Sequence, residues 1–227
     1  FAALRPELVT LYVGWNALYR ESFLEDARGL RRYLHSARML SRALAALRAR
    51  LGDRRAAAVE AYERPRRPDR TAKDLGLLDA YVPSFMGEVG RIVDSMQAAG
   101  SRVVVLTLPS LYASDRDPGP AALAIGHLPA FTDNPFVLAR MAERTNEALR
   151  ALARERGLAL VDLDLWARET LHPPEAHFID SVHLDEPSQE RLGVHLADAL
   201  APLLRGGAPG ASGEATAASV AKAPAAR

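Results

Sequence analysis

Residues 8–16 read LVTLYVGWN, and the run before Gly14 is built of apolar, aromatic and β-branched residues without a charge. A run of this kind, closed by a glycine, is typical of a strand that is buried on both faces of a parallel sheet. Two further runs are largely apolar: residues 103–108 (VVVLTL), which Pro109 ends, and residues 158–163 (LALVDL), which contain one acidic residue, Asp162. The sequence therefore predicts three buried strands.

Helical periodicity fills the intervals between these runs. A capping box, SFLE, opens a predicted helix over residues 22–51, whose apolar residues recur at alternating steps of three and four. Further helices are predicted over residues 138–153 and from about residue 187 to 204. Another predicted helical face, over residues 78–96, consists of Leu78, Val82, Phe85, Val89, Ile92, Val93 and Met96.

Strands that alternate with helices indicate βαβ units, and apolar strands indicate that helices cover both faces of the sheet. The predicted fold class is therefore α/β, with three layers (α/β/α) and a parallel sheet. The chain has 227 residues, 48% of them hydrophobic, which suits one domain over residues 1–205. Residues 206–227 are rich in Ala, Gly, Ser and Pro, and we expect a disordered tail there.

Charge and composition exclude several classes of protein. Lys and Arg number 29 against 28 Asp and Glu, so no large field of one sign favours a nucleic acid, and small or neutral substrates fit better. No apolar run reaches the roughly 18 residues of a membrane span. The absence of cysteine excludes disulfides and thiolate chemistry but leaves the compartment unknown. Because Phe1 leads almost directly into an apolar run, we expect an N-terminal truncation.

Two short motifs carry candidate chemistry. Ligands of parallel sheets bind beyond the carboxyl ends of the strands, where Gly14-Trp15-Asn16 follows the first predicted strand. An amide at Asn16 could donate into such a cleft. The second motif, Asp180-Ser181-Val182-His183, precedes the last helix. A carboxylate three residues before a histidine can fix the imidazole tautomer and stabilise the imidazolium of a general base. From spacing alone, a contact that only stabilises the loop is an equal alternative.

Together these features resemble the SGNH/GDSL hydrolase family over about residues 6–204. The shared features are the Gly-x-Asn after one strand, the strand that ends in proline, Asn146 on a helix, the Val-Asp-Leu strand and the final Asp-x-x-His. The resemblance implies a flavodoxin-like SGNH hydrolase fold. It also implies an oxyanion hole at Gly14 and Asn16, and a catalytic pair of Asp180 and His183. Ala17 stands where family members usually have Asp, which concerns support of the loop.

The family's nucleophilic serine, in a Gly-Asp-Ser block, is not found in this chain. By the resemblance that block and the first strands lie upstream of Phe1. Ser212, in the tail, has neither the strand before it nor the helix after it that a nucleophile turn requires, and Ser181 is interpreted as structural. The implied function is hydrolysis of an ester bond by serine acyl transfer on a small-molecule or carbohydrate ester. No cofactor and no metal are implied, and this fragment alone is expected to be inactive.

Other interpretations remain open from the sequence. The domain could be an O-acetyltransferase of SGNH type, or a non-catalytic SGNH-like binding module that uses the helix at residues 30–51. A metal-dependent enzyme is a further alternative, because imidazole and carboxylate ligands gather in one loop, with Asp162 and Asp164 near a strand end. That loop contains His172, His177, Asp180, His183 and Asp185. Trp166 and Tyr112 are expected near the cleft because they follow strands, whereas His35, His127 and His195 receive no role. The oligomeric state is not indicated.

Overall fold

The computed structural model describes residues 6–21, 23–24 and 66–205. The helix predicted over residues 22–51 and the predicted tail at residues 206–227 lie outside the described residues, apart from residues 23–24, which are helical. The described part contains a parallel sheet in the order β1-β2-β3. Its strands are β1 (Leu8–Leu11), β2 (Arg102–Leu106) and β3 (Ala159–Val161).

All three predicted strands are confirmed, although each is shorter than its apolar run. In the register, Leu8 of β1 lies opposite Arg102 of β2, and Val104 of β2 lies opposite Ala159 of β3. The middle strand has the most continuous burial, from Val103 to Leu106. The strand prediction was therefore most accurate for the strand that pairs on both sides, where an apolar run without interruption is needed.

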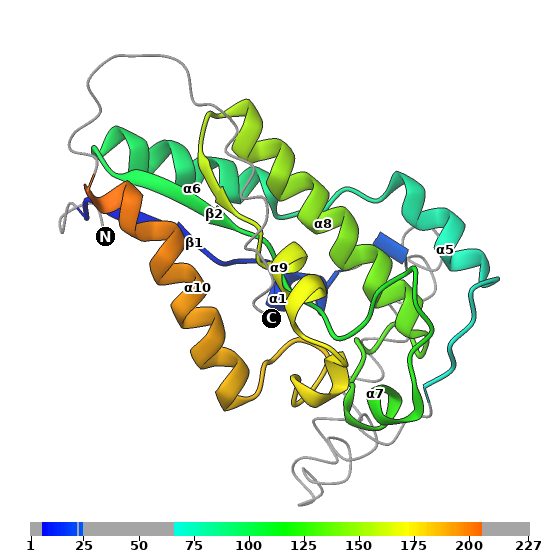
Figure 1. Cartoon of the computed structure of the whole chain (residues 1–227). Coiled ribbons are helices and arrows are strands. Elements are labelled where there is room, and N and C mark those ends of the chain that lie inside the picture. The colour runs from blue at the N-terminus through cyan, green and yellow to red at the C-terminus, as the bar shows by residue number, and fades with distance from the viewer. Residues whose placement is uncertain (1–5, 22, 25–65, 206–227) are drawn as a thin grey trace, which may run out of the picture.

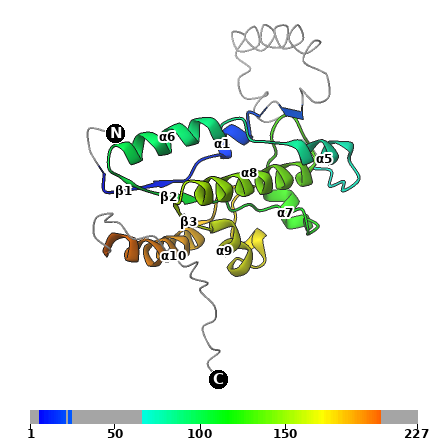
Figure 2. The same cartoon turned by 90° about the horizontal axis from the view of Figure 1, so that it is seen from above.

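Helices cover both faces of this sheet, as the apolar strands predicted. In Figure 2 the sheet is seen between α6 on one side and α10 on the other, which confirms an α/β arrangement. In Figure 1, α8 runs diagonally beside the strands, and it packs against β2, β3 and α6. The described helices are α1 (Trp15–Leu18), α5 (Lys73–Leu77), η2 (Leu78–Ala80), α6 (Met86–Ala98), α7 (Pro120–Ile125), α8 (Pro135–Glu155), α9 (Leu163–Thr170), η3 (Pro174–Ala176) and α10 (Glu186–Arg205).

The helix predicted over residues 78–96 is wrong in its first half. Leu78 lies in the short η2 turn, and α6 begins only at Met86. Pro83 separates the two, because a proline disfavours helical geometry at the residue before it. Val82, which was assigned to the buried face, is 72% exposed, and Ile92 on α6 is 42% exposed.

The helices predicted over residues 138–153 and about 187–204 are confirmed as parts of α8 and α10. Pro135 occupies the first turn of α8, where a missing N–H costs nothing, and the side chain of Asn134 caps the helix by accepting from the Phe136 N–H at 3.1 Å. The inner face of α10 packs on the sheet through the leucines that periodicity selected: Leu192, Leu196, Leu200 and Leu203.

The main core joins β2 to α8. Val105 and Leu108 pack there with Val137, Met141 and Leu149, all almost fully buried. Burying one such side chain contributes roughly 1.5–3 kcal/mol, so this cluster fixes α8 against the carboxyl end of the central strand. Within the described residues, no helix combines the length and the apolar character needed to cross a membrane.

Candidate active site

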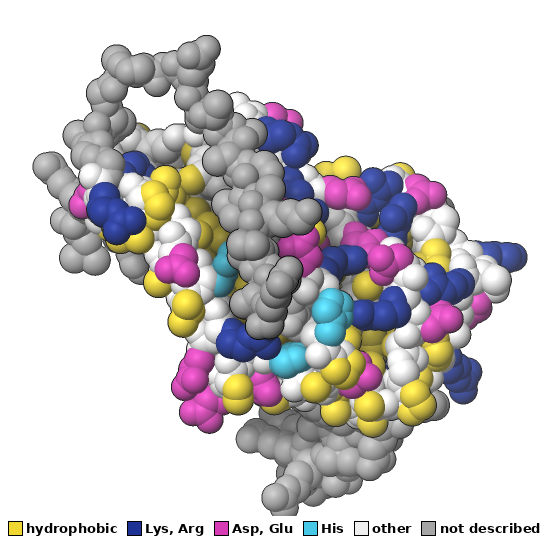
Figure 3. All heavy atoms as spheres, viewed as in Figure 1, with side chains coloured by type: hydrophobic (Ala, Val, Ile, Leu, Met, Phe, Trp, Pro, Cys, Tyr) yellow, Lys and Arg dark blue, Asp and Glu magenta, His cyan; other side chains and the backbone are white. Residues whose placement is uncertain are grey.

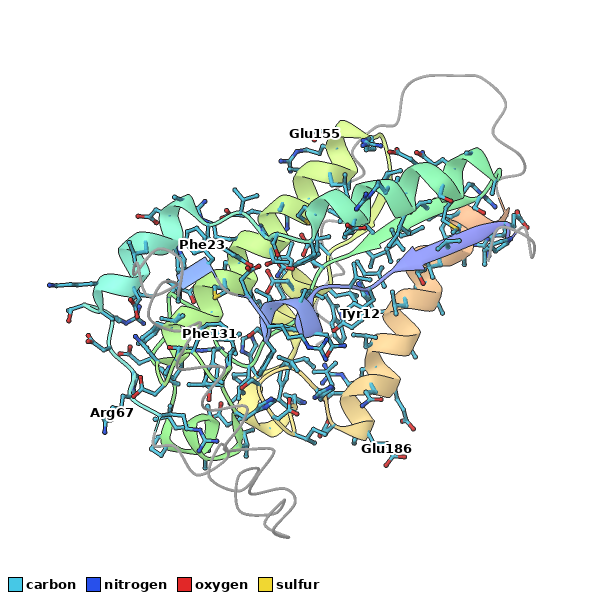
Figure 4. All side chains as sticks on the ribbon, turned by 180° about the vertical axis from the view of Figure 1, so that it is seen from behind. Tyr12, Phe23, Arg67, Phe131, Glu155 and Glu186 are labelled. Carbon is cyan, nitrogen blue, oxygen red and sulfur yellow. The ribbon has the colours of Figure 1, made fainter. Side chains whose placement is uncertain are left out.

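A cleft of about 650 Å³ opens beyond the carboxyl end of β1. This size is ordinary for a small-molecule site. In Figure 1, α1 and α9 are seen at this end of the sheet, and Figure 4 labels Tyr12 where β1 passes into α1. The cleft brings the two sequence motifs together, because it is lined by Tyr12, Val13, Gly14, Trp15, Asn16, Ala17, Tyr19, Phe85, Glu88, Val89, Ile92, His127, Val182 and His183.

The turn from β1 into α1 requires glycine. Gly14 has φ +142°, a region that other residues rarely adopt, and a Cβ built there would lie 2.7 Å from Leu108 Cδ1. Its carbonyl accepts from the Leu18 N–H at 2.9 Å, which closes the short helix α1. Asn16 lies in this helix, exposed at the edge of the cleft. The tight turn thus holds an amide side chain directly beyond the strand.

Asp180 and His183 form a hydrogen-bonded pair. The Nδ1 atom of His183 lies 2.7 Å from Oδ2 of Asp180. The other carboxylate oxygen accepts from the backbone N–H groups of Val182 at 2.8 Å and His183 at 2.9 Å. The carboxylate is therefore fixed by the backbone of its own turn, and Nε2 is the ring nitrogen that remains for proton transfer.

The electrostatics of Asp180 suit an orienting carboxylate. Partial burial on its own would raise the pKa of Asp180, but the hydrogen bonds from Val182 and His183 outweigh it and hold the pKa below its ordinary value. The group is therefore ionised at neutral pH. An ionised carboxylate at Nδ1 stabilises an imidazolium at the moment the ring accepts a proton.

Buried contacts fix the loop that carries this pair. Ser181 is fully buried, its hydroxyl donates to the carbonyl of His127, and its own carbonyl accepts from the Leu111 N–H at 3.0 Å. Ile179 N–H donates to the carbonyl of His183 at 2.9 Å. Because Ser181 is inaccessible and points its hydroxyl at a carbonyl, it supports the loop and is not positioned to attack a substrate.

The residues after His183 fix the start of α10. Asp185 Oδ1 accepts from the Ser188 N–H at 2.9 Å, as an N-terminal capping carboxylate does. Nδ1 of His177 lies 2.9 Å from the hydroxyl of Ser188, which is fully buried. Because Asp185 N–H also bonds to the His177 carbonyl at 2.9 Å, both ends of the His183 loop are held.

The structure does not support the metal alternative. Across the described ranges, no group of three or more His, Asp or Glu side chains is arranged to hold an ion. His177 instead bonds to Ser188, and Asp162 and Asp164 bond to the Arg150 guanidinium at 2.7–2.9 Å. His177, Asp162 and Asp164 therefore make contacts within the fold, and the loop composition alone does not indicate a metal site.

Two residues expected near the cleft lie elsewhere. The Trp166 ring stacks on His195, with 5.2 Å between ring centroids, and Tyr112 is buried with its hydroxyl donating to the Ala122 carbonyl at 3.1 Å. Tyr112 and His172 line a separate cavity of about 400 Å³. Position after a strand was therefore too weak a criterion, since each residue occurs several positions beyond the strand end.

Asn146 has a structural role rather than a place in the cleft. From α8 its side chain donates to the carbonyl of Leu108 at 3.0 Å and accepts from the N–H of Leu108 at 2.8 Å. All of these groups are buried. The amide replaces the strand pairing that β2 loses where it ends, and Leu108 in turn packs under Gly14.

One cleft residue was not found by sequence reasoning. His127 follows α7, far from the other motifs in the chain, and lines the cleft with its Nδ1 4.0 Å from Oδ2 of Asp180. A single histidine in a proline-rich loop carries no spacing signal. None of the described residues that line the cleft is a serine, threonine or cysteine.

Comparison with known proteins identifies no relative: no family model, no curated protein and no solved structure matches this chain.

Proposed function

We propose that this chain carries the acid–base and oxyanion part of a serine ester hydrolase of the SGNH type, with a nucleophile supplied from upstream of Phe1. The observation that carries the proposal is the 2.7 Å pair of Asp180 and His183 beside the cleft that Gly14 and Asn16 also line. Either motif alone has an ordinary structural explanation. Their convergence on one cleft is what acyl transfer requires.

The proposed mechanism assigns one role to each of these groups. A serine hydroxyl attacks the ester carbonyl carbon, and Nε2 of His183 accepts the hydroxyl proton. Asp180 stabilises the resulting imidazolium, and the Asn16 amide donates to the oxyanion. When the intermediate collapses, His183 returns the proton to the departing alcohol. Water then attacks the acyl-enzyme by the same route, which releases the acid and restores the serine.

The edge of the sheet offers a place for the nucleophile. Among the described strands, β1 pairs with β2 alone, so its other edge is open in this part of the chain. A parallel strand added at that edge would end beside Gly14, next to the cleft. A serine at the carboxyl end of such a strand would then face Asn16 and His183, as ligand sites in parallel sheets require.

The lining of the cleft favours a neutral ester. Tyr12, Trp15 and Phe85 contribute aromatic surface, and the one acidic side chain among the described lining residues, Glu88, is paired with Arg91. On the face seen in Figure 3, basic and acidic side chains are intermixed, with histidines among them. No strong field of one sign acts on that face, so a small-molecule or carbohydrate ester is the proposed substrate class.

The test is hydrolysis of p-nitrophenyl acetate by the protein extended upstream to its natural start. His183→Ala should lower the rate by at least about 10³, because the general base is lost. His195→Ala is the matched control: His195 stacks on Trp166 outside the cleft, so its rate should stay within about twofold. A fluorophosphonate should label an upstream serine. Equal rates in the two variants, together with no labelling, would refute the proposal and favour a binding module.

A further inference from the structure

His127 belongs to the same small cluster as the Asp180–His183 pair. Its imidazole is 24% exposed and packs against the Tyr19 ring, with 4.9 Å between the ring centroids. Its backbone carbonyl accepts from the hydroxyls of Tyr19, at 3.1 Å, and Ser181. Two segments of the cleft, the turn after α1 and the Asp180 loop, therefore hold His127 at a fixed distance from the carboxylate.

Two imidazoles face one carboxylate oxygen. Nδ1 of His183 lies 2.7 Å from Oδ2 of Asp180, and Nδ1 of His127 lies 4.0 Å from the same atom. The first separation is a hydrogen bond and the second is slightly too long for one. While both rings are neutral, His183 therefore holds Asp180. A positive charge on His127 while His183 is neutral would place a cation within ion-pair range of that oxygen, and the charge-assisted bond would then be the stronger of the two.

The groups around His127 favour its neutral form at pH 7. Asp180 and His183 face it from the loop before α10, Arg66 from the segment before α5, and Tyr19 from the turn after α1. Burial is the main cause that lowers the pKa of His127 below its ordinary value. Arg66 and His183 act in the same direction, and Asp180 opposes them. Protonation therefore belongs to the acidic range.

We propose that His127 is a positioning residue for His183: neutral, it leaves Asp180 to orient the base, and protonated, it competes for the Asp180 carboxylate. The inference rests on the proposed function for its catalytic consequence, but the competition itself is a property of three side chains that this chain contains. Protonation of His127 would then weaken the hydrogen bond by which Asp180 orients neutral His183.

The experiment is an NMR titration of the histidine Cε1–H resonances of this chain, assigned with single-histidine variants. In the native chain the His183 resonance should shift as His127 takes up its proton. In His127→Phe, which keeps a ring against Tyr19 but cannot take a proton, that shift should disappear. His127→Gln, a neutral polar replacement, should also lose it, and provides the test if the Phe variant does not fold.

Two outcomes would overturn the inference: a His183 resonance that does not shift as His127 is protonated, or a shift that survives in the folded variants. Because the titration needs no nucleophile, it is independent of the proposed hydrolase. In the upstream-extended protein, kcat/KM should fall more steeply toward acid pH in the native protein than in His127→Phe. A His183 shift coupled to His127 without any ester hydrolysis would refute the proposed function and leave the His127 competition standing.

Discussion

Replacing Asn146 with leucine should destabilise the protein through two buried backbone groups. The amide side chain satisfies both the N–H and the carbonyl of Leu108, at 2.8 and 3.0 Å. Leu108 is fully buried and Asn146 is 1% exposed, so water cannot replace the lost partners. The side chain of leucine has a similar size and makes no hydrogen bond. The measured loss of stability therefore reports the missing hydrogen bonds and not a cavity.

The expected cost follows from these two groups. A buried backbone donor or acceptor that loses its partner costs about 1–3 kcal/mol, so the pair costs about 2–6 kcal/mol. Added apolar burial offsets part of this cost, and about 3 kcal/mol should remain. Thr145→Val is the matched control on the same helix: its hydroxyl donates to the Met141 carbonyl at 2.9 Å, which lies within the helix. That change should cost about 1 kcal/mol.

Urea unfolding followed by circular dichroism at 222 nm measures both variants. The midpoints should differ with similar m-values, so that the difference reports stability. Equal losses for Asn146→Leu and Thr145→Val would show that Leu108 finds other partners. The proposed role of Asn146 in fixing the end of β2 would then be wrong.

Further substitutions and pH test other parts of the site. Gly14→Ala should cost about 2 kcal/mol or more in unfolding free energy, because its backbone is strained and Leu108 blocks a Cβ; Gly87→Ala in α6, with open space around it, should not destabilise. Arg150→Ala should cost about 2–4 kcal/mol because Asp162 and Asp164 lose their shared partner, whereas exposed Arg91→Ala should cost under about 0.5 kcal/mol. Asp180→Asn in the upstream-extended protein should lower kcat by about 10³–10⁴, because asparagine no longer fixes the tautomer of His183. The Tm should not fall to a comparable degree. The stability that Asp162 and Asp180 contribute should be constant above the ordinary aspartate pKa of 3.8 and be lost as pH drops further, because burial is outweighed by hydrogen bonds that lower the pKa of both groups; a Tm that does not fall in acid would contradict this.

The sequence predicted the fold class for a simple physical reason. A strand covered on both faces must be largely apolar, and residues 103–108 and their two counterparts are. The helix prediction was wrong at residues 78–85. Apolar residues keep helical spacing there, but Pro83 prevents the backbone from continuing as a helix. Periodicity indicates which side chains would share one face of a helix. Whether that helix forms depends on local backbone restrictions, such as the one that a proline imposes.

The sequence by itself determined the parts of the site that depend on neighbours in the chain. Asp180 and His183 meet because a three-residue turn brings them together, and Gly14 is needed because the chain turns sharply after β1. Only the tertiary structure decided what comes from distant segments. In the tertiary structure His127 lies near the Asp180 carboxylate, and Asp162 and Asp164 pair with Arg150. Trp166 and Tyr112 lie away from the cleft. Such contacts depend on how helices pack across the sheet, and that packing leaves no spacing rule in the sequence.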